Sequence, residues 1–93
     1  MKPTHDPALL QRVREQFCLV CGDTPCDPDH VKTRGAGGGD TIDNVMPLCR
    51  RHHTERGTLG IASMVNKYPG IYRWMVTHGR EDILEKATRF NRG

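Results

Sequence analysis

Cysteine and histidine residues form two closely spaced pairs in this sequence. Two residues separate Cys18 from Cys21, and Cys49 and His52 are spaced in the same way. A gap of two residues allows both members of a pair to reach one tetrahedral ion, and two such pairs complete the shell of a structural zinc. The sequence therefore predicts a structural Zn²⁺ site at these four residues. Such a closed site does no chemistry, but its binding energy contributes directly to folding.

Disulfide bonds are the alternative for these cysteines, and the start of the chain argues against them. The segment MKPTHDPALL lacks the apolar stretch of a signal peptide, and no apolar run is long enough to cross a membrane. We therefore expect a soluble, cytoplasmic protein with no membrane partner, whose cysteines stay reduced. Cys26 could replace a ligand, pack as a small buried residue or be a free thiol, and we exclude it from the predicted zinc ligands.

A second set of polar residues, which the zinc site does not use, consists of Asp29, His30, Asn44 and His53. Adjacent strand residues point to opposite faces, so Asp29 and His30 are expected to play different parts. His52 and His53 lie about 100° apart on a helix, which predicts that only His52 faces the zinc. A carboxylate and an imidazole can hold a divalent cation with open positions, and a free histidine can accept a proton from water at neutral pH. Taken singly, each residue also has an ordinary structural explanation, such as a turn or a surface position.

The order of these motifs is more specific than any one residue. C-x2-C-G, DPDHV, GAGGGD and DNVMPLC-x2-HH, within about residues 16–60, resemble the HNH nuclease family in its zinc-containing form, common among phage and prophage proteins. The resemblance implies a ββα-metal (His-Me finger) core, with Asp29 and His30 on the first strand and His53 on the helix. It also implies Asp29 and His53 as ligands of a catalytic Mg²⁺ or Mn²⁺, His30 as general base, and Asn44 as the residue that fixes the loop and orients His30. The expected products carry 5′-phosphate and 3′-hydroxyl ends.

The sequence departs from this family pattern at one position. Many relatives carry a further histidine one helical turn after the residue that matches His53, where it can join the metal shell, but here that position is Gly57. Two protein ligands plus waters are normal for magnesium. We therefore expect weak binding of the catalytic metal.

The elements expected to position these residues make an α+β fold in one domain over residues 1–93. We predict an N-terminal helix over 6–17, a zinc and ββα core over 18–57, and C-terminal helices over 58–91. Within the core, 30–33 and 44–48 are expected as short strands joined by a glycine loop, and a helix from Cys49 is expected to stop near Gly57.

The charge of the chain permits nucleic-acid binding but does not require it. The formal net charge is +3, and the expected partner is double-stranded DNA, contacted through its backbone. A homodimer is possible. The predicted function is a metal-dependent DNA endonuclease or nickase, and the alternatives are a catalytically weak or inactive zinc-stabilised nucleic-acid-binding module, or a purely structural zinc protein. The residues predicted to contact DNA are basic and surround the motifs: Lys32, Arg34, Arg50, Arg51 and Arg56.

Overall fold

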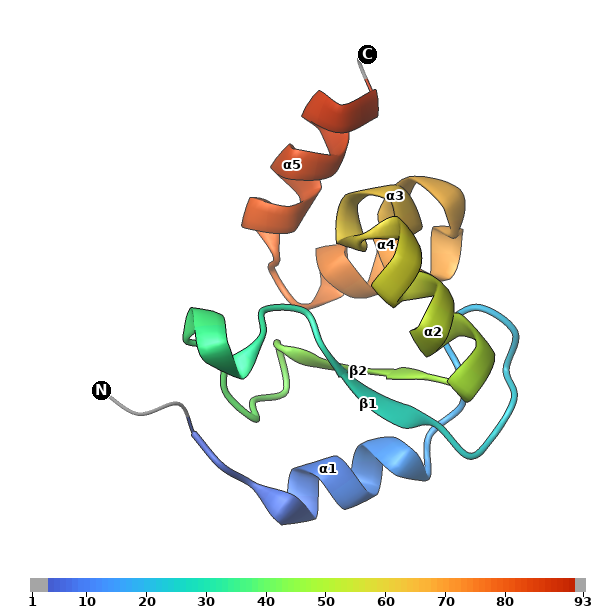
Figure 1. Ribbon diagram of the computed structural model, residues 1–93, viewed down its shortest axis with the longest axis vertical. Helices are drawn as coiled ribbons and strands as arrows, with labels where there is room; N and C mark the ends of the chain where they lie inside the picture. Colours follow the sequence, from blue (N-terminus) through green and yellow to red (C-terminus); the bar gives the residue numbers. More distant parts are fainter. Residues whose placement is uncertain (1–3, 92–93) are drawn as a thin grey trace.

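A short two-stranded ribbon lies across the middle of the molecule, with helices on both sides (Figure 1). The computed structural model describes the backbone of residues 4–91 and the side chains of residues 4–89. The predicted α+β class is confirmed. The elements in chain order are α1 (Pro7–Arg14), β1 (Asp27–His30), the 3-10 turn η1 (Arg34–Ala36), β2 (Val45–Leu48), α2 (Arg50–Leu59), α3 (Ile61–Lys67), α4 (Pro69–Thr77) and α5 (Glu81–Asn91).

The ribbon is antiparallel, and its register sets the position of the polar residues. Asp29 lies opposite Met46, and His30 lies opposite Val45 at the end of the pairing. The first strand was predicted at 30–33, which is wrong: it occupies Asp27–His30. One further hydrogen bond, from Val31 N to Asn44 O (2.8 Å), follows the last pair. Beyond it, the chain turns into η1 instead of continuing the strand.

Helix α1 covers one side of the ribbon and is shorter than the predicted range of 6–17. Asp6 caps it by accepting a hydrogen bond from Leu9 N (3.1 Å), and Leu9 and Val13 pack on Val45. The helix ends at Arg14, whose carbonyl accepts a hydrogen bond from Cys26 N (3.0 Å). The chain therefore leaves the helix before residue 17 and enters the cysteine-bearing turns.

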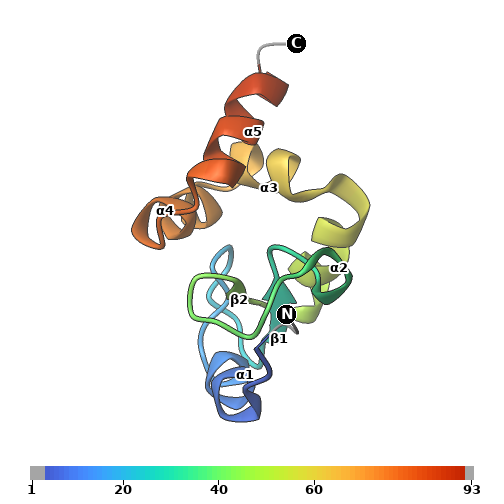
Figure 2. The same cartoon turned by 90° about the vertical axis from the view of Figure 1, so that its left-hand side faces the viewer.

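The other helices lie on the opposite side of the ribbon from α1 (Figure 2). The fully buried side chains of β2, α3 and α4 include Met46, Leu48, Met64, Ile71 and Met75, and they form the centre of the main core. Within the described residues, no helix combines the length and the apolar character that a membrane crossing requires.

Helix α2 does not stop near Gly57 as predicted. It continues to Leu59, and Gly60 ends it with a φ of 85°. A glycine inside a helix costs only about 1 kcal/mol relative to alanine, so it weakens the helix without terminating it. The positive φ at Gly60, which glycine adopts readily, breaks the run and allows α3 to begin at Ile61.

Candidate metal group and active site

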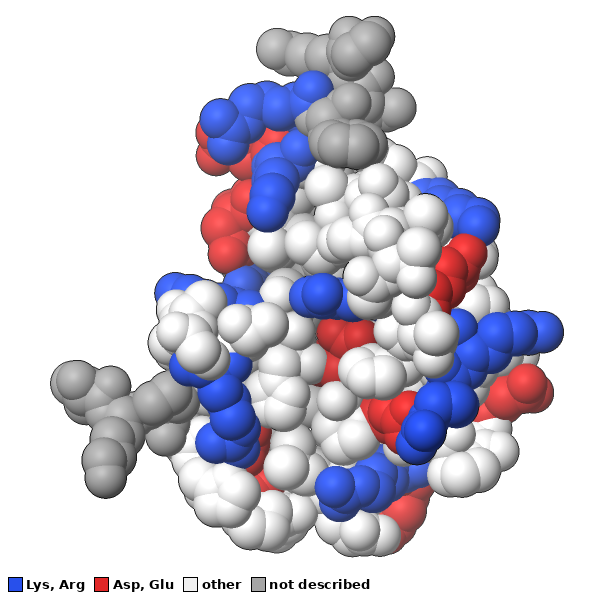
Figure 3. Space-filling model, in the orientation of Figure 1, with Lys and Arg blue, Asp and Glu red and all other residues white. Residues whose placement is uncertain are grey.

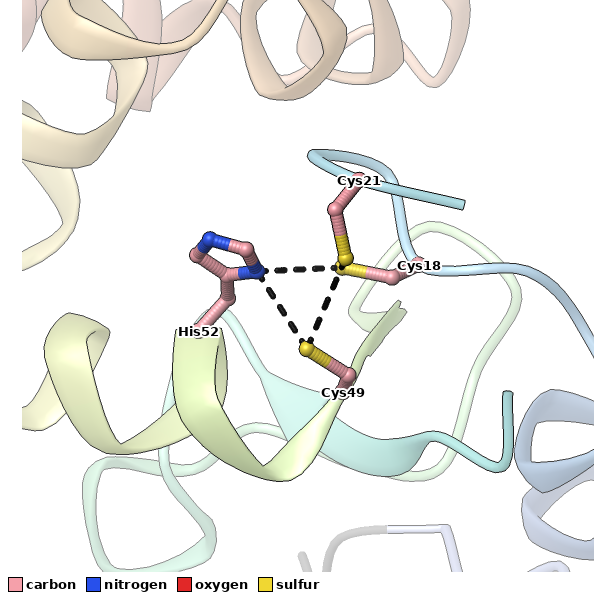
Figure 4. Close-up of side chains that lie close together, drawn as sticks. All are labelled: Cys18, Cys21, Cys49 and His52. Carbon is pink, nitrogen blue, oxygen red and sulfur yellow. Dashed lines mark hydrogen bonds between the residues drawn. The ribbon is translucent and has the colours of Figure 1, made fainter. Parts of the chain in front are cut away.

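The predicted zinc ligands converge on one point between the first cysteine turn and the start of α2 (Figure 4). One ligand atom from each of Cys18, Cys21, Cys49 and His52 lies within 4.8 Å of all the others. The Sγ atoms of Cys21 and Cys49 are 3.8 Å apart, and His52 Nδ1 lies 3.6 Å from Cys18 Sγ and 3.2 Å from Cys49 Sγ. Around a tetrahedral zinc, two sulfur ligands are expected about 3.8 Å apart and a sulfur and a nitrogen about 3.6 Å apart. The four residues thus form a group that could hold a metal ion such as zinc.

The pKa values of Cys18, inside this group, and Cys26, outside it, shift in opposite directions. Burial raises the pKa of Cys18, but backbone hydrogen bonds at Cys49, Cys21 and Val20, with His52, outweigh it and lower the pKa to about 6. A thiolate, the form that binds metal, is therefore favoured there at neutral pH. Cys26 is buried outside the group, and burial together with the nearby cysteines raises its pKa to about 11, so it stays a neutral thiol.

Residues from β1 and α2 meet in an open pocket of about 410 Å³ that is separate from the cysteine group. Asp29 is buried at its floor, and its Oδ2 lies 2.7 Å from His53 Nδ1. Burial raises the pKa of Asp29, while the charge of Arg56 and the hydrogen bond from His53 oppose that rise. The full lining of the pocket is Pro28, Asp29, His30, Thr33, Arg34, His53, Arg56 and Gly57.

Arg56 occupies the wall of this pocket beside Asp29. Its Nη2 donates to the carbonyls of His30 (3.3 Å) and Val31 (3.0 Å). Its Nε lies 3.3 Å from Asp29 Oδ1, which is an ion-pair distance, yet the buried Nε is not oriented to donate a hydrogen bond to any partner among the described residues. A permanent positive charge therefore lies next to the carboxylate that was predicted to bind the catalytic metal.

His30 lines the same pocket from the end of β1, and its ring contacts a carboxylate that the sequence analysis did not assign. His30 Nε2 lies 2.7 Å from Asp40 Oδ1. The sequence analysis expected different roles for Asp29 and His30. In the structure their side chains contact different residues: Asp29 contacts His53 and Arg56, whereas His30 contacts Asp40.

Asn44 closes the loop between the two strands. Its Oδ1 accepts hydrogen bonds from Lys32 N (2.9 Å) and from Arg80 Nη1 (3.0 Å), and its Nδ2 donates to the carbonyls of Lys32 (3.0 Å) and Gly39 (2.9 Å). No hydrogen bond of Asn44 goes to His30 among the described residues. The side chain therefore fixes the loop, and an effect of Asn44 on the orientation of His30 stays a prediction.

Two glycines of this loop lie very close to other segments of the chain. A Cβ on Gly38 would lie 1.9 Å from Lys32 O and 2.8 Å from Asn44 Nδ2, and a Cβ on Gly39 would lie 2.8 Å from Thr4 N. Only glycine allows these contacts. At Gly38 and Gly39 the loop is thus packed against Lys32, Asn44 and the N-terminal segment, whereas Gly35 and Gly37 are exposed.

We expect Asn44→Ala to destabilise the zinc-loaded protein by roughly 2–4 kcal/mol, because it removes four hydrogen bonds and leaves backbone groups of the loop unpaired. Urea unfolding measures the effect. Asn66→Ala is the control, because the Asn66 side chain makes one hydrogen bond, to Ala87 O. Equal losses in the two variants would contradict the role of Asn44 as a loop clamp.

The residues predicted to contact DNA differ in their surroundings. On the face shown in Figure 3, basic side chains lie in separate groups with acidic ones between them. Arg34 and Arg56 line the pocket, and Arg50 pairs with Asp27 (2.6 Å). Lys32 and Arg51 are exposed. Only two of the five predicted residues therefore lie at the candidate active site.

Sequence reasoning missed Asp40 and Arg80, and each missed residue contacts a residue that was predicted. Asp40 contacts His30, and Arg80 donates to the carbonyl of Asp43 (2.9 Å) and to Asn44. Asp40 directly follows the glycine run, which is the one signal that could have pointed to it. Arg80 has no such signal, because it lies 36 residues beyond Asn44.

Comparison with protein-family models assigns the chain to one family. The family model described as "Putative HNHc nuclease" matches residues 5–86. The chain is also similar to "Uncharacterized protein YdfU" of Escherichia coli (strain K12), with 42% identity over 53 residues. That match covers 54% of this chain but only 15% of the relative, so the chain spans a small part of that protein. No solved structure matches the chain significantly.

Proposed function

The chain belongs to the HNH nuclease family, and we propose that it is a metal-dependent DNA endonuclease or nickase that hydrolyses phosphodiester bonds. The family implies a nucleic acid as substrate. The observation that carries the proposal is the pocket in which Asp29, His30 and His53 meet, with two arginines in its wall. Buried carboxylate, imidazole and guanidinium groups in one open pocket are the groups that phosphoryl transfer requires.

Asp29 and His53 fit a single divalent cation. Adjacent ligands of an octahedral Mg²⁺ lie about 3.0 Å apart, and the Asp29 Oδ2 to His53 Nδ1 distance is 2.7 Å. Among the described residues, the cysteine group is the one place where three or more potential ligand residues converge, so this pair supplies two protein ligands. When bound, such a cation, Mg²⁺ or Mn²⁺, stabilises negative charge on the phosphate and on the leaving 3′-oxygen.

The remaining groups of the pocket supply the proton transfer and the binding of the phosphate. His30 accepts the proton of the attacking water, and Arg34 and Arg56 contact the phosphate oxygens. Attack on the phosphorus with departure of the 3′-oxygen leaves 5′-phosphate and 3′-hydroxyl ends. Cys18, Cys21, Cys49 and His52 hold a structural Zn²⁺ that keeps α2, and with it His53, in place.

Plasmid cleavage tests this proposal. We expect the zinc-loaded protein to convert supercoiled plasmid to the nicked form with Mg²⁺ or Mn²⁺ but not with EDTA. The substitution Asp29→Asn should slow the reaction roughly 100- to 1,000-fold. Asp27→Asn is the matched control, because Asp27 lies on the same strand, two residues earlier, and pairs with Arg50 outside the pocket. Equal activity of the two variants, or cleavage that survives EDTA, would contradict the proposal.

The form of the cleaved plasmid distinguishes a nickase from an endonuclease that cuts both strands, and a second substrate tests the preference for DNA. Linear plasmid without a nicked precursor would indicate two sites acting together in a homodimer, and nicked circles would indicate a nickase. A parallel incubation with single-stranded RNA separates DNA cleavage from general nuclease activity.

A catalytically weak or inactive zinc-stabilised nucleic-acid-binding module is the second candidate, and Arg56 favours it. The guanidinium beside Asp29 opposes a divalent cation at the same carboxylate, and Gly57 offers no third ligand. This candidate predicts that the protein shifts plasmid in a gel yet nicks it with neither Mg²⁺ nor Mn²⁺.

A further inference from the structure

One buried carboxylate joins two residues of the pocket that the proposed reaction uses. The side chain of Asp40 is fully buried, and it contacts His30 Nε2 through Oδ1 (2.7 Å) and Arg34 Nη2 through Oδ2. His30 and Arg34 both line the pocket, while Asp40 lies behind them. We infer that Asp40 is a positioning residue, which holds the His30 ring with the proton on Nε2 and leaves Nδ1 as the nitrogen that accepts a proton. The inference rests on the proposed function in taking His30 as the base.

The protonation state of Asp40 decides the direction of this hydrogen bond. Burial raises the pKa of Asp40, but the hydrogen bonds from His30 and Asp6 N and the charge of Arg34 outweigh it and hold the pKa at about 2. An ionised carboxylate only accepts hydrogen bonds, so Nε2 must be the donor. In the neutral ring Nδ1 then carries the lone pair, and it has no hydrogen-bond partner among the described residues.

The N-terminal segment fixes Asp40 from the side away from the pocket. Asp40 N donates to Thr4 O (2.8 Å), and Asp6 N donates to Asp40 Oδ2 (2.9 Å). Gly39 packs closely against Thr4, so the loop and the N-terminal segment lie in direct contact beside Asp40. The carboxylate is therefore held by the backbone N–H of Asp6 as well as by His30 and Arg34, and the backbone of Asp40 is itself anchored, so its orientation does not depend on His30 alone, which is what a positioning residue needs.

Arg34 gains its orientation from the same carboxylate. Its Nη2 contacts Asp40 Oδ2 and donates to His5 Nδ1 (2.9 Å), and its side chain is 43% exposed at the pocket. The guanidinium is thus fixed at one end, and its remaining N–H groups stay available to a phosphate. Asp40 in this way places the base and one phosphate-binding group relative to each other.

The tautomer of His30 tests the inference without any nuclease activity. We expect two-bond ¹H–¹⁵N correlation spectra of the zinc-loaded protein, recorded where the ring is neutral and assigned with His30→Gln, to show a protonated Nε2 and a bare Nδ1. Asp40→Asn should lose this preference, since its amide can either accept from or donate to Nε2, and should slow nicking roughly 100- to 1,000-fold with little change in KM. Asp43→Asn is the control, because Asp43 is an exposed carboxylate of the same loop whose side chain contacts Thr41.

Each outcome bears on the inference in a different way. A wild-type ring with the proton on Nδ1 would overturn it, and this measurement does not require any Asp40 variant to fold. An Asp40→Asn variant that keeps its zinc, the wild-type tautomer and the wild-type nicking rate would overturn it as well. If the tautomer shifts in Asp40→Asn but the wild type nicks no substrate, the positioning by Asp40 is supported and the proposed nuclease function fails.

Discussion

Chelation of zinc from the Cys18–Cys21–Cys49–His52 group should unfold the whole chain. A chain of 93 residues buries only about 60–65% of its unfolded surface and has a marginal core. Cys18 and Cys49 belong to the main hydrophobic cluster, next to Leu48. Apparent binding energies of structural zinc in small domains, about 10–16 kcal/mol, match or exceed a typical total stability of about 5–15 kcal/mol. Without the metal, the buried thiolate of Cys18 would remain in the core with no metal ion to stabilise it.

Circular dichroism during titration with a zinc chelator measures this effect, and zinc added back should restore the signal. Cys21→Ser should behave like the metal-free protein, because it removes one of the four ligands. Cys21 is exposed, so the change leaves no cavity that would destabilise the protein by itself. Cys26→Ala is the control: it removes a buried thiol outside the group, and we expect it to keep full zinc and lose about 1 kcal/mol. A metal-free protein with an unchanged cooperative transition would contradict the structural role of the metal.

The sequence predicted those features of the site that depend on local spacing. The two-residue gaps in both ligand pairs and the separation of His52 from His53 follow from backbone geometry, and the structure places His52 in the cysteine group and His53 against Asp29. The α+β class followed from the same motifs. These relations span a few residues, so the chain encodes them without reference to its tertiary structure.

The features that could not be predicted depend on contacts between distant segments. The N-terminal segment reaches Asp40 across 34 residues, from Asp6 N, and Arg80 reaches Asn44 across 36. Neither contact has a periodicity or a spacing rule that a single sequence could reveal. The end of α2 was misplaced for a related reason: both Gly57 and Gly60 are compatible with a helix end, and the start of α3 selects Gly60.

Arg56 and Asp40 carry opposite charges and contact different residues of the pocket. Arg56 lies beside Asp29, where it opposes a cation, whereas Asp40 lies behind His30 and Arg34, where it stabilises positive charge. The guanidinium groups of Arg34 and Arg56 thus line the same pocket as His30. Under the proposed function, we expect these guanidinium groups to favour an anionic substrate and to make the affinity for the metal depend on the bound phosphate.

His30→Ala should reduce nicking roughly 100- to 10,000-fold, which is the range that a general base contributes. The side chain of His30 is 21% exposed and lines the pocket, so it can reach a water molecule there. Its removal breaks no hydrogen bond to Asp29, His53 or the cysteine group among the described residues, because the hydrogen bond of the His30 ring goes to Asp40. The loss should therefore appear in kcat, with zinc content and plasmid binding retained.

Imidazole added to the reaction provides the sharper readout, since it can enter the open pocket and replace the missing ring. We expect it to restore part of the activity of His30→Ala and none of that of Asp29→Asn, which lacks a metal ligand instead of a base. His78→Ala is the matched histidine control, because His78 stacks on Trp74 outside the pocket. A His30→Ala variant that nicks at the wild-type rate would remove His30 from the reaction, and the pocket would then need another base.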